Sequence, residues 1–70
     1  MEAAPLGTDE VELLRLIAQG LLVDAVARRL DLSERTVRRR VRVVCDRLGV
    51  RTPIEAVVWA VRNGLLEDGA

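Results

Sequence analysis

The stretch VDAVARRLDLSERTVRRRVRVVCDRL, residues 23–48, decides the fold. It contains a short and a long segment with helical spacing of apolar residues, joined by residues 31–33. Ser33 is a good N-cap, because its hydroxyl can accept a hydrogen bond from a backbone N–H of the following turn. The spacing therefore predicts a short helix over residues 23–30 and a longer one over residues 33–48.

One helix is expected before this pair and one after it. The earlier helix begins near Thr8, and Gly20 suits the left-handed position that ends a helix. Pro53 fits the first turn of the later helix, which extends over residues 54–63 before Gly64. Apolar residues at helical spacing predict a core stripe on this last helix, and they are Ile54, Val57, Val61 and Leu65.

Length and composition limit the chain to one domain. Seventy residues allow one small core, and 50% hydrophobic with 31% charged residues is typical of a globular chain. No segment shows the sustained alternation of a β-strand. The sequence predicts a compact all-α, four-helix domain over residues 8–66, with flexible tails at residues 1–7 and 67–70.

The residue types argue against several classes of function. Histidine is absent and Cys45 is the single cysteine, so one chain cannot assemble a zinc cluster, a disulfide or a Cys/His nucleophile pair. We therefore expect no enzyme activity, no metal and no cofactor. Cys45 is expected to be a buried small hydrophobe, with an intermolecular disulfide switch as the alternative. Because the sequence has neither a long apolar run nor a leader, we expect the protein in the cytoplasm, at the nucleoid, and not in a membrane.

The arginines are concentrated in one part of the chain. Residues 28–51 hold nine arginines and three acids, a net charge of +6, whereas the rest carries −6. In the helix over residues 33–48, a valine stripe that includes Val37 predicts the core face. Like charges on the other face repel one another unless an anion lies there, although a solvated charged face is the alternative. The cations of that outer face are Arg35, Arg38, Arg39 and Arg42.

A short helix, a tight turn and a longer basic helix form the helix-turn-helix arrangement. In this arrangement the second helix lies in the major groove of double-stranded DNA, and its N-terminal half meets the bases. The pattern therefore predicts DNA binding. The alternative is a protein-interaction module of the same shape that binds an acidic partner protein, such as a sigma factor or a sensor domain.

Several separated motifs also agree in spacing with one family, without a gap from residue 6 to residue 66. They are LRLIAQGL (14–21), ARRL (27–30), LSE (32–34), TVR (36–38), LGV (48–50) and EAV (55–57). The chain thus resembles the LuxR/FixJ-type, GerE-like DNA-binding domain of bacterial transcription regulators. The resemblance implies transcription regulation, often as the output domain of a response regulator whose N-terminal sensor or receiver domain is absent from this chain.

The resemblance also implies roles for single residues. Because arginine pairs well with O6 and N7 of guanine, a half-site that contains guanine is expected. Base contacts in the major groove are assigned to Arg38, Arg39 and Arg42. Contacts with DNA phosphates are assigned to Arg35, Thr36, Arg40 and Arg51.

The last helix is the expected dimerisation helix. It is apolar on more than one face, and the resemblance implies a homodimer on paired half-sites. Partial burial of Trp59 against the first helix is the alternative for that side chain. The predicted interface residues are Val58, Trp59 and Arg62.

The start of the second helix departs from the family pattern. Members usually carry Ser or Thr, then Lys, then Glu, where this chain has Leu22, Asp24 and Ala25. The usual capping box and phosphate contacts are therefore missing, with Asp24 as a substitute cap. Leu21, Leu22 and Val23 form an apolar patch that belongs either to the core or to a protein contact.

Overall fold

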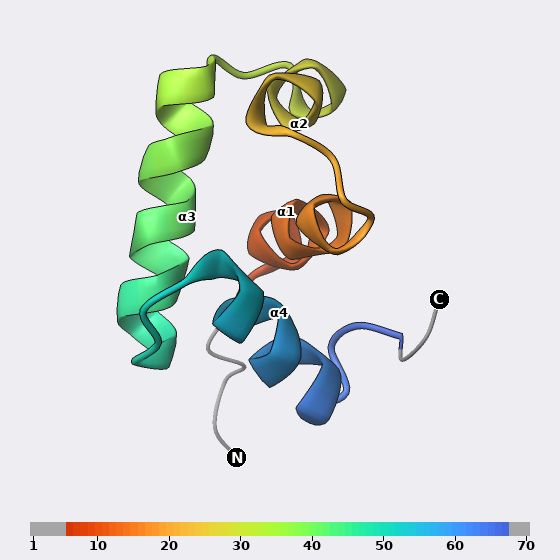
Figure 1. The fold of residues 1–70 in the computed structure, drawn as a ribbon, viewed down its shortest axis with the longest axis vertical. Coiled ribbons are helices and arrows are strands. Elements are labelled where there is room, and N and C mark those ends of the chain that lie inside the picture. The colour runs from red at the N-terminus through yellow and green to blue at the C-terminus, as the bar shows by residue number, and fades with distance from the viewer. Residues whose placement is uncertain (1–5, 68–70) are drawn as a thin grey trace.

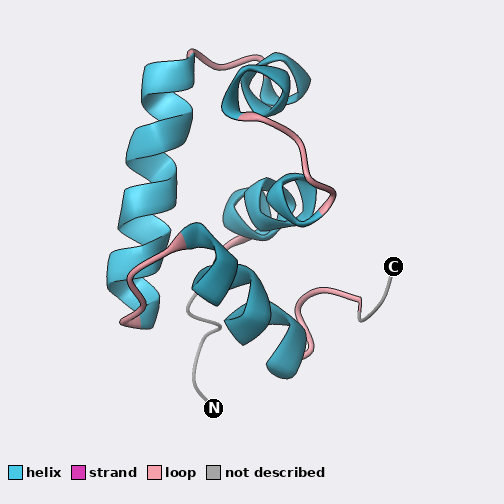
Figure 2. Cartoon of the chain, in the orientation of Figure 1, coloured by secondary structure: helices cyan, strands magenta, loops and turns pink. Residues whose placement is uncertain are grey.

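The computed structural model describes residues 6–67 and contains there four α-helices joined by short turns (Figures 1 and 2). No strand occurs among these residues, so the all-α prediction is confirmed. The parts of the expected tails that comprise residues 1–5 and 68–70 lie outside the described residues. The helices are α1 (Thr8–Ala18), α2 (Val23–Leu30), α3 (Glu34–Leu48) and α4 (Pro53–Arg62).

The longest helix, α3, lies along one side of the molecule (Figure 1). Helix α2 packs beside its N-terminal end, α4 crosses near its C-terminal half, and α1 lies between α2 and α4. Helix α1 contacts all three others. The core therefore lies where the four helices meet, and its most enclosed side chains are Leu13, Leu14, Val26, Val37 and Val44.

Local signals end the helices where the sequence predicts. The Ser33 hydroxyl accepts a hydrogen bond of 3.1 Å from the backbone N–H of Thr36, which caps the start of α3. Gly49 ends that helix with a left-handed φ of 71°. Helix α2 instead ends at Asp31, which adopts φ 58°, a conformation that Asp tolerates better than most residues. Asp31 therefore supplies the left-handed residue that ends α2, as Gly49 does for α3.

The start of α4 is fixed by a capping box. The Thr52 hydroxyl accepts from the backbone N–H of Glu55 at 3.1 Å. The Glu55 carboxylate accepts in return from the backbone N–H groups of Arg51 and Thr52, both at 2.9 Å. These bonds stabilise the ionised carboxylate and lower the pKa of Glu55 from its ordinary value of 4.5. The bond from the backbone of Arg51 has the largest effect and that from Thr52 the next.

The capping box predicts a pH dependence of stability. The pKa of Glu55 is lower in the folded than in the unfolded protein, so the ionised carboxylate stabilises the fold. This contribution to the free energy of unfolding is complete above about pH 4.5 and is lost as the pH falls through the folded-state pKa. Glu55→Gln is therefore expected to lower the thermal midpoint at pH 7, and this difference should shrink steadily below pH 4.5. Midpoints measured by circular dichroism between pH 7 and pH 3 check this.

The matched control is Glu67→Gln. Glu67 is exposed, and the described part of the chain gives its carboxylate no hydrogen-bond donor. Its replacement is expected to leave the midpoint unchanged over the same pH range. A Glu55→Gln difference that stays constant down to pH 3 would contradict the capping role of the charge.

Cys45 is buried, as expected. Burial raises the pKa of its thiol, and the negative charges of Asp46 and Glu55 raise it further. The sulfur is therefore held as the neutral thiol rather than the reactive thiolate at neutral pH.

Two expectations about the core need correction. Leu6 lies within the expected flexible tail, but it is 5% exposed and joins the core cluster. Ile54 belongs to the expected core stripe of α4, but it is 67% exposed. The packed face of α4 is instead centred on Ala56 and Ala60, both fully buried, because small side chains allow α4 to approach α1 closely. The other three residues of the expected stripe pack partly against the core.

The apolar patch before α2 belongs partly to the core and is partly exposed. Leu21 and Val23 pack partly against the core, whereas Leu22 between them is 76% exposed. Leu22 occupies the N-cap position of α2 and supplies no side-chain cap. The carboxylate of Asp24 accepts the backbone N–H of Ala25 at 2.9 Å, so it replaces only part of a capping box.

Candidate nucleic-acid interface

The outer face of α3 carries the largest group of cations in the molecule. Val37 and Val44 on the inner face are buried and fix the rotation of the helix about its axis. Five arginines are consequently exposed to solvent along its first three turns, namely Arg35, Arg38, Arg39, Arg40 and Arg42. The structure thus brings together all the predicted base contacts and two of the predicted phosphate contacts.

Most of these arginines lack a protein counter-charge. Among residues 6–67, only Arg38 of this group forms an ion pair, 3.1 Å from Glu34 one turn earlier. Both side chains of the pair are largely exposed, and such surface pairs contribute little to stability. Arg38 can therefore exchange Glu34 for another anion at low cost. The arginines without an ion pair in this part of the chain are Arg35, Arg39, Arg40 and Arg42.

Thr36 sits at the start of α3 with its hydroxyl already oriented. The Ser33 hydroxyl donates to the Thr36 hydroxyl oxygen at 2.9 Å, while the Thr36 backbone N–H donates to Ser33. Since the Thr36 oxygen is the acceptor in this bond, its own proton is not used in it and can be donated to another acceptor. Phosphate oxygens are acceptors of this kind.

One side of α3 borders a cleft of about 440 Å³ at the start of α4. Arg38 and Arg42 line it from α3, and Arg51 lines it from the turn before α4. Arg51 is exposed and is positioned by its backbone N–H bond to Glu55. The predicted phosphate contact Arg51 thus lies beside two of the predicted base contacts.

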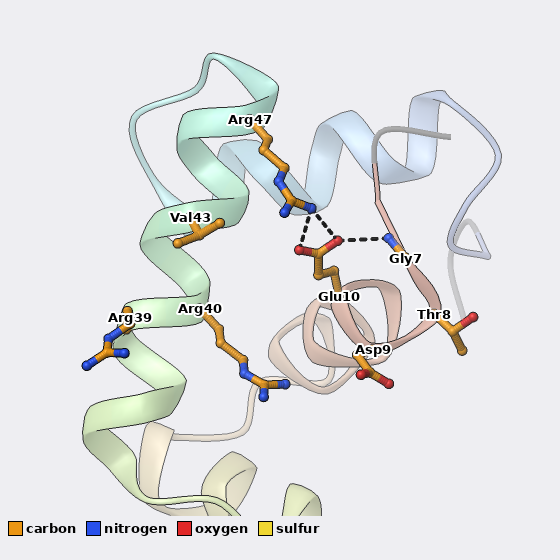
Figure 3. Close-up of a pocket in the computed structure, with 8 residues that line it drawn as sticks. All are labelled: Gly7, Thr8, Asp9, Glu10, Arg39, Arg40, Val43 and Arg47. Atoms are coloured by element: carbon orange, nitrogen blue, oxygen red, sulfur yellow. Dashed lines mark hydrogen bonds and ion pairs between the residues drawn. The ribbon is translucent and has the colours of Figure 1, made fainter. Parts of the chain in front are cut away.

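The other side of α3 borders a cleft of about 540 Å³ at the start of α1. Arg39 extends away from α1, whereas Arg40 extends into the space between the two helices (Figure 3). Arg47 spans this cleft and places Nη1 at 2.7 Å and 2.9 Å from the two carboxylate oxygens of Glu10. Arg47 is thereby neutralised, and the unbalanced charge lies nearer the N-terminal end of α3.

The Glu10–Arg47 ion pair was missed by sequence reasoning. The two residues are 37 positions apart, and no local pattern connects them. Glu10 also accepts the backbone N–H of Gly7 at 2.8 Å and so caps α1. One carboxylate therefore holds both the start of α1 and the last turn of α3.

The start of α2 offers no cationic contact of its own. Asp24 is exposed and lies 3.8 Å from Arg28, one turn later. An acid at this end of α2 repels phosphate, and Leu22 has no polar group in its side chain. The start of α2 therefore adds no side-chain cation to the arginines of α3.

The outer face of α4 is partly apolar. Ile54, Val58 and Arg62 follow one another at intervals of four residues, and all three are exposed. Val58 is 43% exposed, and Trp59 is half-buried against the core cluster. Of the predicted dimer residues, Val58 and Arg62 thus face outward, while Trp59 divides its surface between core and solvent.

A buried valine stripe beneath an arginine-rich outer face, after a capped turn, agrees with a known family. The family model described as bacterial regulatory proteins, luxR family, matches residues 4–60. The chain belongs to this luxR family. The resemblance inferred from the motifs is thereby confirmed, and the luxR-family domain is a DNA-binding domain of a transcription regulator.

Several curated relatives of this luxR-family domain are response regulators or transcriptional regulators by name. The chain is 42% identical over 50 residues to the nitrate/nitrite response regulator protein NarL of Escherichia coli (strain K12), which covers 71% of this chain and 23% of NarL. It is 42% identical over 57 residues to the transcriptional regulatory protein YdfI of Bacillus subtilis (strain 168), which covers 81% of this chain and 27% of YdfI.

The match to a third relative covers nearly the whole of this chain. The transcriptional regulatory protein DesR of Bacillus subtilis (strain 168) is 33% identical over 63 residues, which are 90% of this chain and 32% of DesR. The luxR-family domain therefore spans a quarter to a third of the length of these relatives. Among the described residues, no helix is long and apolar enough to cross a membrane.

Proposed function

We propose that this domain binds double-stranded DNA in a sequence-specific manner, with α3 in the major groove. The observation that carries the proposal is the row of exposed arginines on a helix whose opposite face is locked into the core. In this pose the outermost side chains reach the base edges, where arginine is the commonest partner of guanine. The base contacts are Arg38, Arg39 and Arg42.

Phosphate contacts flank this row on both sides. Arg40 lies toward α1, and Arg51 lies toward the start of α4, so the two positions can meet opposite strands of the groove. Arg35 and the hydroxyl of Thr36 add contacts near the first turn of α3. Such contacts set the register of the protein on DNA and carry no base preference themselves.

The active unit is a homodimer on paired half-sites. The exposed apolar face around Val58 on α4, bordered by Arg62 and by the exposed part of Trp59, supplies a self-complementary surface. Because the regulator relatives are about three times as long as this chain, the domain acts as the output of a chain with an N-terminal sensor or receiver domain, at the nucleoid in the cytoplasm.

Arg39 and Arg40 provide the decisive comparison. Arg39→Ala is expected to lower affinity for the selected site about tenfold and to relax the base preference at one position. Arg40→Ala is expected to weaken selected and random duplexes alike and to reduce the salt slope by about 0.9, since one phosphate contact is lost. The measurement is selection from random duplexes, followed by anisotropy titrations at several salt concentrations.

The two variants control for each other, because both remove one exposed arginine from adjacent positions of the same helix. Equal effects of both on base preference would refute the assignment of roles. Absence of any DNA binding at low salt would refute the proposed function as a whole.

A further inference from the structure

A mostly apolar groove of about 240 Å³ lies where the end of α1, the start of α2, the middle of α3 and the first residue of α4 meet. Its only charged lining residue is Arg38, one of the proposed base contacts. The groove opens on the side of α3 opposite to the Glu10–Arg47 ion pair. Its accessible apolar walls come from Ile17, Leu21, Val23, Val41 and Pro53.

The groove continues into the basic cleft at the start of α4. Arg38, Val41 and Pro53 line both hollows, so together they form one surface that is apolar at one end and basic at the other. The basic end adds Arg42 and Arg51. Asp46 is the single acid there, which leaves the surface with an excess of positive charge.

Leu22 lies in the chain between Leu21 and Val23, which both line the apolar end. It is 76% exposed, the highest exposed fraction among the large hydrophobic residues that the structure describes. A single exposed leucine is ordinary on a protein surface, but here the residues on both sides of it in the chain line an apolar groove.

We infer that this surface binds an amphipathic helix of a partner protein, with leucine-like side chains in the groove and carboxylates toward the arginines. Helix-in-groove docking uses an apolar stripe at intervals of three and four residues. The arginines at the basic end require several acidic groups in the occupant. A second copy meets this need poorly, because the basic end carries three arginines and a single acid among its lining residues and so offers no matching acidic surface to itself.

Occupancy has a direct consequence for DNA binding. Arg38 and Arg42 belong to both surfaces, so the helix and the DNA exclude each other. This competition rests on the proposed DNA-binding function, whereas the docking itself does not. A partner that presents such a helix would act as an antagonist of the regulator.

The test uses a labelled synthetic helical peptide of about 15 residues, with leucines on one face and glutamates on the other. One control peptide has the same composition with its leucines shuffled off a common face, and another has lysines in place of the glutamates. Anisotropy titration without DNA is expected to show saturable binding of the acidic amphipathic peptide and at least about tenfold weaker binding of both controls.

Variants locate the site on the protein. Leu22→Asp and Arg38→Ala are each expected to weaken the peptide about tenfold, through lost apolar burial and a lost charge pair respectively. Val43→Asp is the matched control, because Val43 is an exposed apolar residue that lines the α1 cleft and not the groove. It is expected to leave peptide affinity unchanged, and circular dichroism checks that all variants fold.

Equal binding of the shuffled and amphipathic peptides, or none at millimolar concentration, overturns the inference whatever the DNA result. So does a Leu22→Asp variant that dissociates a dimer while peptide affinity is unchanged, since the groove would then hold a second copy. Peptide binding that DNA does not displace would refute the proposed pose of α3 and leave the docking site intact.

Discussion

Replacement of Leu14 by alanine is expected to lower the free energy of unfolding by about 3 kcal/mol. Leu14 is fully buried on α1, which packs against all three other helices, so truncation opens a cavity that no loop can fill. A domain of this size has only a few kcal/mol of total stability, and the variant should be substantially unfolded at 37 °C. Urea titration followed by circular dichroism and by the fluorescence of Trp59 measures the change.

Leu22→Ala is the matched control, since it makes the same chemical change at an exposed position. Its effect on the free energy of unfolding is expected to stay within about 0.5 kcal/mol. Similar losses in both variants would mean that Leu14 is not the packing centre described above.

Val58→Asp is expected to reduce the affinity for a paired site about a hundredfold or more. A carboxylate on the apolar outer face of α4 is costly to desolvate in an interface, so the two domains no longer support each other on adjacent half-sites. Affinity for a duplex with a single half-site is expected to be unchanged, because Val58 lies on α4 and not on the arginine face of α3.

The readouts are titrations of paired and single half-site duplexes, together with sedimentation of the protein–DNA complexes. Equal losses on both duplexes would show that Val58 acts on folding or on DNA contact. An unchanged preference for paired sites would refute dimerisation through α4.

The helix boundaries could be predicted because their causes are local. Ser33 caps α3 through bonds within its own first turn, and Gly49 supplies the left-handed residue after it. The exposed arginines followed from the same kind of reasoning, since a buried valine stripe on α3 leaves the opposite face to solvent. The extent of the basic face could thus be deduced from one helix alone.

Features that depend on the partner of a helix could not be deduced in this way. Helix α4 is apolar on several faces, so periodicity alone did not reveal that Ala56 and Ala60, rather than Ile54, face α1. Leu6 precedes the first helix and has no periodicity to mark it as core. In both cases the side chain that packs is chosen by the space between helices, which the sequence does not display.

The two-ended attachment of α3 has a consequence for any complex with DNA. Ser33 caps its first turn, Val37 and Val44 hold its middle, and Arg47 ties its last turn to Glu10. A helix secured in this way has little compliance, so misfit with a duplex must be absorbed by bending or twisting of the nucleic acid. We therefore expect the preferred operators to include easily deformed base steps that no side chain touches.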